Sequence, residues 1–216
     1  MTSGAFLTLL DGALVTLAAC AAGVAIGMPL GLLFAVARWV DLRFFGRSVA
    51  IYVSVVRSTP VVTLALLVFF GLPSLGIEIG STVAAIILLA VNTSAFNCEV
   101  WRSGLNTFQT DQIEAAKAFG MTSTQLFRRI IFPQLWRQCL PALINEVTML
   151  IKSSPAIAVI GVVDITRAAI RVGAETYDPI PPMLAATLLY CVIIASTIVL
   201  QRVLENRHMR RVSQDA

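Results

Sequence analysis

Residues 12–37 read GALVTLAACAAGVAIGMPLGLLFAVA, a stretch without a charged side chain that is long enough to cross the hydrocarbon core of a membrane. Glycines recur in it at Gly23, Gly27 and Gly31, and small residues of this kind let helices approach closely in lipid. We therefore predict that residues 12–37 form a transmembrane helix that packs tightly against another helix.

The rest of the chain is also strongly apolar. Hydrophobic residues make up 57% of the 216 residues and charged residues 13%, against about 25% charged residues in soluble domains. Four further apolar stretches lie at residues 48–71, 81–99, 138–165 and 183–201. The chain has room for about five spans and short loops but hardly for a soluble domain, which predicts a single all-α, multi-pass membrane domain over residues 1–216.

The 138–165 stretch differs from the others because Glu146, Lys152 and Pro155 interrupt it and because it is longer than one straight crossing requires. Proline removes a backbone hydrogen bond and kinks or breaks a helix. We expect a kink or break near residues 153–155 (SSP). The 48–71 stretch is predicted to form the second span, which ends in a turn at residues 71–74 (GLPS).

Lysine and arginine are distributed unevenly between the predicted loops, and this bias sets the orientation of membrane proteins. One side carries Arg38, Arg43, Arg47, Arg102, Lys117, Arg128, Arg129, Arg137, Arg202, Arg207, Arg210 and Arg211. The other side carries only Arg167 and Arg171. The sequence thus predicts that the C-terminus and the loop at residues 111–133 are cytoplasmic and that the N-terminus is outside.

The loop at residues 111–133 contains EAAKAFG at 114–120, followed after nine residues by IIFP at 130–133. The alanine-rich segment is a strong helix former, and Gly120 can adopt the left-handed conformation that ends a helix. Residues 122–125 (TSTQ) then have the spacing of a capping box, which predicts a second, basic amphipathic helix that halts at the proline of IIFP. Such a helical hairpin could bind nucleic acid, lie on the membrane surface or dock into a groove of a partner protein.

The spacing of this loop, E-A-A, three residues, G, nine residues and I-x-hydrophobic-P, resembles the cytoplasmic loop of bacterial ABC importer permeases. Residues 57–60 (RSTP) and 69–73 (FFGLP) are similar to the R-G-T-P and F-G-L-P stretches of the polar amino acid permeases of histidine, glutamine, arginine and opine type. Residues 95–104 (AFNCEVWRSG) and 150–155 (LIKSSP) are similar to two more of their motifs. The departures from the family pattern are Ser58 and Asp111 in place of glycine and Phe132 and Pro155 in place of leucine.

The resemblance implies a permease of the type I ABC importer fold in the bacterial cytoplasmic (inner) membrane. It implies that a separate ATPase subunit, which binds ATP and Mg, docks on the 111–133 loop and drives transport of a polar amino acid or an opine-like relative. It also implies an extracellular or periplasmic solute-binding protein and a second permease subunit, identical or homologous. The residues expected to couple to the ATPase are Glu114, Ala115, Ala116, Gly120, Ile130 and Pro133.

The chain has no motif that could hydrolyse ATP. Its only lysines, Lys117 and Lys152, follow alanine and isoleucine, so G-x-x-x-x-G-K-[ST] is absent. The four cysteines lack metal-ligand spacing, and the single histidine, His208, is expected to be solvated in a basic tail. We expect a non-catalytic subunit that itself binds no cofactor, metal or nucleic acid.

Charged side chains inside a span are unfavourable by roughly 2.5–3.5 kcal/mol on insertion scales, so Arg57, Glu146 and Lys152 should face protein or water. One interpretation makes them, together with Asn92, a candidate substrate pathway. Glu146 would then meet an α-ammonium or a basic side chain, and Arg57 a carboxylate. The other interpretation makes them structural ion pairs, with Arg57 and Glu146 as one such pair.

Two further predictions concern charges near the ends of spans. Glu99 and Arg102 are three residues apart and can share one face of a helix. For Asp164, Arg167 and Arg171 near the outer surface, solvation is the favoured expectation, and contact with the binding protein is the alternative.

The main alternative from another class is an ion- or proton-coupled amino acid carrier, or a channel, without an ATPase partner. A channel does not need a helical hairpin with this spacing, and a carrier normally supplies both halves of its pathway in one chain. A passive membrane anchor is a third alternative, against which the charges inside the spans count. The sequence leaves open which amino acid is carried, whether the partner permease is identical, and whether this subunit holds a substrate site.

Overall fold

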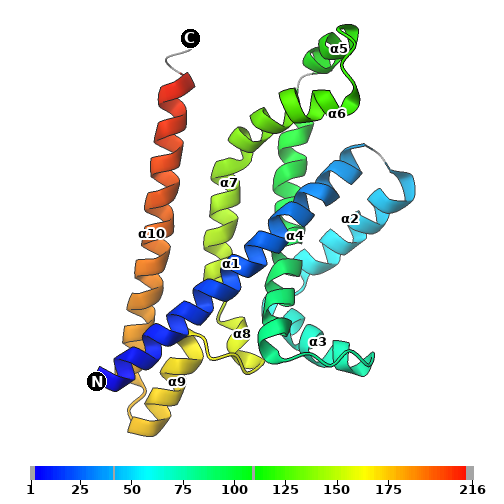
Figure 1. Ribbon diagram of the computed structural model, residues 1–216. Coiled ribbons are helices and arrows are strands. Elements are labelled where there is room, and N and C mark those ends of the chain that lie inside the picture. The colour runs from blue at the N-terminus through cyan, green and yellow to red at the C-terminus, as the bar shows by residue number, and fades with distance from the viewer. Residues whose placement is uncertain (1–2, 41, 109, 213–216) are drawn as a thin grey trace.

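Helices account for all regular secondary structure in the computed structural model, which describes residues 3–40, 42–108 and 110–212 (Figure 1). The elements are α1 (Ser3–Trp39), α2 (Arg43–Ser58), α3 (Val61–Ser74), α4 (Ser81–Asn106), α5 (Thr110–Ala118), α6 (Ser123–Leu126), the π-helix η1 (Phe127–Ile131), α7 (Phe132–Ser153), α8 (Ala156–Val159), α9 (Ile165–Thr176) and α10 (Ile180–Val212). No strand occurs within these ranges, which confirms the all-α fold class. The expectation for His208 concerns a side chain outside the described part of α10.

Four helices within the described ranges are long and apolar enough to cross a membrane: Ser3–Trp39, Ser81–Asn106, Ser123–Val159 and Ile180–Val203. The bent pair of α2 and α3 raises the number to five if it makes one crossing. The predicted count of about five therefore depends on this pair. Figure 1 shows the hairpin of α5 and α6 at the end of the bundle where α10 ends, opposite the N-terminal end of α1.

The glycine stripe of α1 packs against α4, and this is the most extensive helix contact in the fold. A Cβ atom on Gly23 would lie 2.6 Å from Leu89 Cβ, and one on Gly27 would lie 2.6 Å from the Ala90 carbonyl oxygen. Neither position has room for a side chain, so the two backbones touch at these glycines. The predicted tight packing of this span is confirmed, and its partner is a helix of the same chain.

Replacing Gly27 with valine is therefore expected to lower the free energy of unfolding by about 1–3 kcal/mol, because the new side chain must displace backbone atoms of α4. Thermal unfolding of the purified protein in detergent measures the effect. Gly4→Val is the matched control, since nothing lies within 4 Å of a Cβ atom built there. Equal stability of the two variants would contradict this account of the α1–α4 contact.

The predicted span at residues 48–71 is not one continuous helix, because the chain bends by 114° between α2 and α3. The break falls at Thr59, whose backbone is extended at φ −88° and ψ 129°, and at Pro60. Proline has no backbone N–H and disfavours helical geometry in the residue before it. The turn predicted at residues 71–74 lies slightly later in the chain, since α3 runs to Ser74 and the turn follows at Gly76, where φ is +83°.

The hairpin in the 111–133 loop forms as expected at its turn and differs at its end. Gly120 adopts φ +75°, and the side chains and backbones of Thr122 and Gln125 form the predicted capping box. The second helix does not halt at Pro133, however, and continues through η1 into α7. The Phe132 N–H donates to the Phe127 carbonyl five residues back, and this π-turn lets the helix pass the proline without a conventional bond at that point.

At its other end, α7 stops at Ser153, and α8 follows after Ser154 and Pro155. The regular helix is thus interrupted where the sequence predicted a break. At the loop end, by contrast, α6, η1 and α7 follow one another without a loop. Together with α8 they make up the helical segment Ser123–Val159.

The junction between α8 and α9 is a polar, buried part of the fold. Asp164 is 0% exposed and caps α9, where its Oδ1 accepts from the Arg167 N–H at 2.8 Å and its Oδ2 accepts from the Tyr190 hydroxyl at 3.2 Å. The Ile165 N–H donates to Thr16 Oγ1 of α1 at 3.2 Å. The expectation that Asp164 is solvated is wrong, because this segment joins α1, α9 and α10.

Candidate functional site

Two adjoining cavities lie along α4 and α7. The loop-side cavity, of about 370 Å³, is lined by Arg57, Phe96, Glu99, Val100, Ser103, Gly104, Thr107, Gln138, Cys139, Ala142 and Glu146. The mid-bundle cavity, of about 270 Å³, is lined by Val24, Val61, Asn92, Thr93, Phe96, Asn145, Glu146, Val147, Met149, Leu150 and Ser153. Phe96 and Glu146 contribute to both cavities, so the two cavities meet at these side chains.

The charges at this meeting point are not engaged in an ion pair. The Arg57 guanidinium lies over the Phe96 ring, 5.2 Å from its centroid, in a cation–π contact. Glu146 faces the same cavity and interacts electrostatically with Arg57. In the described ranges, Glu99 forms ion pairs within 4.0 Å with Arg38 and Arg102, whereas no such pair joins Arg57 to Glu146. The interpretation that makes Arg57 and Glu146 a structural ion pair is therefore wrong.

Three of the four pathway residues expected from the sequence come together. Asn92 is buried and lines the mid-bundle cavity, while Arg57 and Glu146 line the loop-side cavity. Lys152 is exposed on α7 and is not among the residues that line these two cavities. It therefore lies apart from the other three.

Sequence reasoning missed a polar face on α7. Gln138, Asn145 and Lys152 follow one another at intervals of seven residues, and all three are exposed on the isolated chain. Side chains seven apart lie on the same side of a helix, so this spacing could have revealed the face from the sequence. Polar groups in a span avoid lipid, and this face must therefore meet water or another protein.

A charge cluster joins α1 to α4 at the loop side. Glu99 accepts hydrogen bonds from Arg102 Nε at 3.0 Å and Nη2 at 2.6 Å, which confirms the pair expected from their spacing. Arg38, at the end of α1, donates to the other carboxylate oxygen of Glu99. The sequence could not show this second partner, because Arg38 lies 61 residues away.

The hairpin of α5 and α6 presents an apolar groove. The groove, of about 460 Å³, is lined by Gln112, Ala115, Ala116, Phe119, Met121, Ile130 and Gln134. Phe119 at the tip is 89% exposed, whereas Ala116 is 5% exposed and packs inside the hairpin. Of the other residues expected to couple, Glu114 is exposed on α5, Gly120 forms the turn and Pro133 lies in the first turn of α7.

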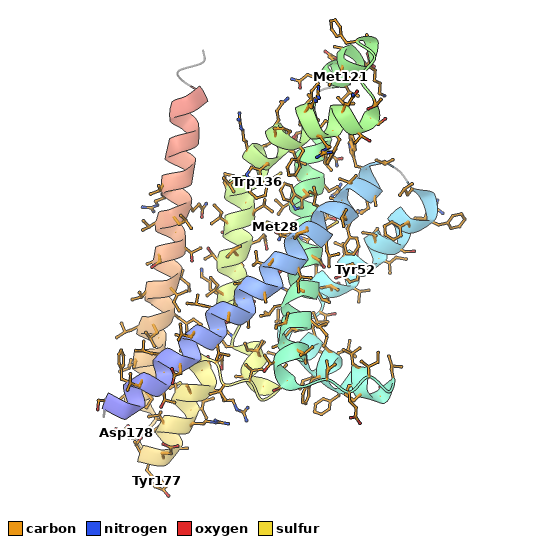
Figure 2. The ribbon with its side chains drawn as sticks, viewed as in Figure 1. Met28, Tyr52, Met121, Trp136, Tyr177 and Asp178 are labelled. Carbon is orange, nitrogen blue, oxygen red and sulfur yellow. The ribbon has the colours of Figure 1, made fainter. Side chains whose placement is uncertain are left out.

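Aromatic contacts connect this hairpin with the helices that line the cavities. The ring centroids of Phe127 and Phe132 are 6.1 Å apart, those of Phe132 and Trp136 are 6.4 Å apart, and those of Trp136 and Trp101 are 5.8 Å apart. Figure 2 shows Trp136 on α7 in the same half of the molecule as Met121 of the hairpin, with Tyr177 at the opposite end. The contacts run from η1 through α7 to α4.

These features define a class of protein. A bundle of apolar helices with a charged cavity, a polar helix face and a large helical loop at one end is a multi-pass membrane permease. The chain belongs to the family described as binding-protein-dependent transport system inner membrane component, which matches residues 27–210.

Similar proteins of known type narrow the class of permease. It is 34% identical over 187 residues to the arginine transport system permease protein ArtQ of Bacillus subtilis (strain 168), covering 86% of this chain and 85% of that protein. It is 36% identical over 172 residues to the nopaline transport system permease protein NocM of Agrobacterium fabrum (strain C58 / ATCC 33970), covering 74% and 71%. A solved amino acid ABC transporter, crystallised with histidines, matches with a TM-score of 0.84 and 32% identity over 93% of this chain and 94% of that one.

The resemblance to polar amino acid ABC permeases is thereby confirmed. The protein is an inner-membrane permease of the amino acid ABC transporter family and has the fold of type I ABC importer permeases.

Proposed function

We propose that this protein is the transmembrane subunit of an ATP-driven importer that moves a polar amino acid or an opine-like relative across the inner membrane. A separate ATPase subunit docks on the 111–133 loop and supplies the energy. The observation that carries the proposal is the single helical segment Ser123–Val159, which holds one wall of the loop groove at Ile130 and also Glu146 of the cavities. A force applied to the loop therefore acts on the helix that lines the pathway.

The hairpin has the surface expected of a docking element. Phe119 exposes most of its ring at the tip, beside a groove whose wall includes the small Ala115, and exposed aromatic anchors of this kind dominate the binding energy of interfaces. Glu114 and Lys117 are exposed on the same short helix and provide charges for the rim. ATP and Mg belong to the partner, which orients the loop side of this chain toward the cytoplasm, together with the C-terminus.

The aromatic contacts support coupling to two helices at once. Because Trp136 stacks on the buried Trp101 of α4, a movement of the hairpin displaces the cavity walls on both α4 and α7. Packed side chains transmit such shifts because a close-packed interior deforms little.

A second permease subunit, identical or homologous, completes the pathway. The polar face of α7 at Gln138, Asn145 and Lys152 is open on the isolated chain. A partner permease that faces it would enclose a water-filled route between the two subunits, as polar groups in a span require. The glycine stripe of α1 does not provide this contact, because α4 already covers it.

The chemistry of the cavities suits an amino acid. Arg57 offers a planar guanidinium for a carboxylate, and Glu146 offers a carboxylate for an ammonium or a basic side chain. Asn92 and Asn145 add amide groups in the mid-bundle cavity. Two similar proteins are named for transport of arginine and of nopaline, and arginine is the first solute to test. A solute-binding protein would deliver it at the end of α9, opposite the loop.

Uptake of labelled amino acids into vesicles that contain this permease, its candidate ATPase and its binding protein tests the proposal. We expect uptake only with ATP and binding protein present. Glu114→Lys, which reverses an exposed charge on the docking helix, should reduce both uptake and ATPase binding. Arg47→Gln, on α2 and not among the residues that line the groove, should change neither. Uptake that proceeds without ATP would favour the carrier or channel instead. So would uptake that is unchanged in Glu114→Lys although this variant no longer binds the ATPase.

A further inference from the structure

The boundary between the loop-side and mid-bundle cavities is made of very few groups. Phe96 of α4 and Glu146 of α7 line both cavities, and Arg57 of α2 lies over the Phe96 ring on the loop side. A solute that leaves the mid-bundle cavity toward the loop must therefore pass these three side chains. The passage is bounded by one cation, one anion and one aromatic face.

Arg57 lies next to the bend between α2 and α3, a place where the backbone can move. It lies in the last turn of α2, two residues before Thr59, where the chain bends by 114° into α3. A helix end beside such a break can tilt without carrying the next helix with it, because the break absorbs the change in backbone angles. The position of Arg57 can thus change while α3 stays packed.

The contacts of Arg57 also allow it to move. Its side chain is exposed on the isolated chain, and within the described ranges it forms no ion pair, unlike Arg38 and Arg102, which are fixed by Glu99. A cation over an aromatic face has no directional bond to break. Arg57 is therefore held in place weakly, opposite an acid that it can approach or leave.

We propose that Arg57 is the gate residue between the two cavities: over Phe96 and facing Glu146, its guanidinium closes the passage, and it opens the passage when it leaves the ring. The inference rests on the proposed transport function and assigns the step at which a solute is released toward the loop. The positive charge makes the closed gate selective, because the guanidinium repels cations and attracts anions.

Thiol labelling from the loop side tests the gate. Ser153→Cys reports on the mid-bundle cavity and Ser103→Cys on the loop-side cavity. Both are made in the full chain with Cys139→Ser and Cys191→Ser, in membrane vesicles that hold the complete system without ATP. The probes are a cationic and an anionic methanethiosulfonate of similar size, and the membrane face from which Ser103→Cys is modified defines the loop side.

With Arg57 present, we expect the cationic reagent to modify Ser153→Cys at least about tenfold more slowly than it modifies Ser103→Cys; tenfold corresponds to about 1.4 kcal/mol. We also expect the cationic reagent to modify Ser153→Cys more slowly than the anionic reagent does. Arg57→Gln should remove most of this delay, and Phe96→Leu should do the same because it removes the surface that holds the guanidinium. Arg47→Gln, on the same helix, is the matched control and should change nothing. An unchanged Ser103→Cys rate in each variant shows that the bundle is intact.

Two results would overturn the gate. One is that Ser153→Cys reacts as fast as Ser103→Cys while Arg57 is present, so that no barrier exists. The other is that Ser153→Cys stays slow in both Arg57→Gln and Phe96→Leu, so that these side chains are not the barrier. Labelling uses neither ATP nor uptake, so loss of the proposed transport function would appear in the uptake assay and leave these rates as they are.

Discussion

Replacing Phe119 with aspartate is expected to abolish ATP-driven uptake while the permease still inserts into the membrane. Phe119 is 89% exposed at the tip of the hairpin and makes one wall of its groove. Truncating an aromatic anchor at the centre of an interface costs about 2–4 kcal/mol, and a buried charge adds a desolvation penalty. Binding of the ATPase should therefore weaken by roughly 30-fold to 1,000-fold, as measured by co-purification with the permease and by uptake.

Phe44→Asp is the matched control, because Phe44 is also 89% exposed but lies at the start of α2 and does not line the groove. It should leave ATPase binding intact. If Phe119→Asp binds the ATPase as well as the unaltered protein does, the hairpin is not the docking element and the proposed coupling fails.

Glu146→Gln is expected to have a comparable effect on transport through a different step. The substitution keeps the size of the side chain and removes its charge at the point where the two cavities meet. Losing one partner of a desolvated charge pair costs about 2–5 kcal/mol. For a solute with an ammonium or guanidinium group, we expect KM to rise by roughly 30-fold or more, while ATPase binding to the hairpin is unchanged.

Glu78→Gln removes an acid from the exposed connection between α3 and α4 and serves as the control. Uptake measured over a wide range of solute concentrations separates the two variants. An unchanged KM in Glu146→Gln would remove this residue from the substrate pathway and leave it a structural role only.

The two parts of the proposal predict different combinations of results. Phe119→Asp should lose ATPase binding and uptake together, whereas Glu146→Gln should lose uptake at low solute concentration and retain the ATPase. A carrier or channel would respond to Glu146→Gln alone. The pair of variants thus separates the ATP-driven importer from the alternatives that the sequence left open.

Two prolines show that the sequence alone does not predict whether a helix breaks at a proline. At Pro60 the helix breaks and the chain turns by 114°, although the apolar stretch reads as one span. At Pro133 the helix was predicted to stop, and it continues because a π-turn at η1 accommodates the ring. Proline removes the same hydrogen bond in both places, and the surrounding packing decides whether the helix breaks or adjusts.

Among the charged residues, too, local contacts follow from the sequence and distant contacts depend on tertiary packing. The spacing of three residues predicts the pair of Arg102 with Glu99, since local helix geometry fixes which neighbours meet. Arg38 joins Glu99 and Asp164 is buried against Tyr190, and these contacts depend on how distant helices cross. The crossing of helices also decides that Arg57 forms no ion pair with Glu146, because its guanidinium lies over the ring of Phe96 instead.

The sequence by itself determined that the chain is an all-α membrane protein, that it carries a helical hairpin with a glycine turn and a capping box, and that it resembles the amino acid ABC permeases. These properties follow from composition and from patterns a few residues long, which act locally. Only the tertiary structure decided that α4 covers the glycines of α1, that the loop helix runs unbroken into α7, and that Arg57, Phe96 and Glu146 meet between two cavities. The reason is physical: such contacts join residues far apart in the chain, and the crossing of whole helices sets them.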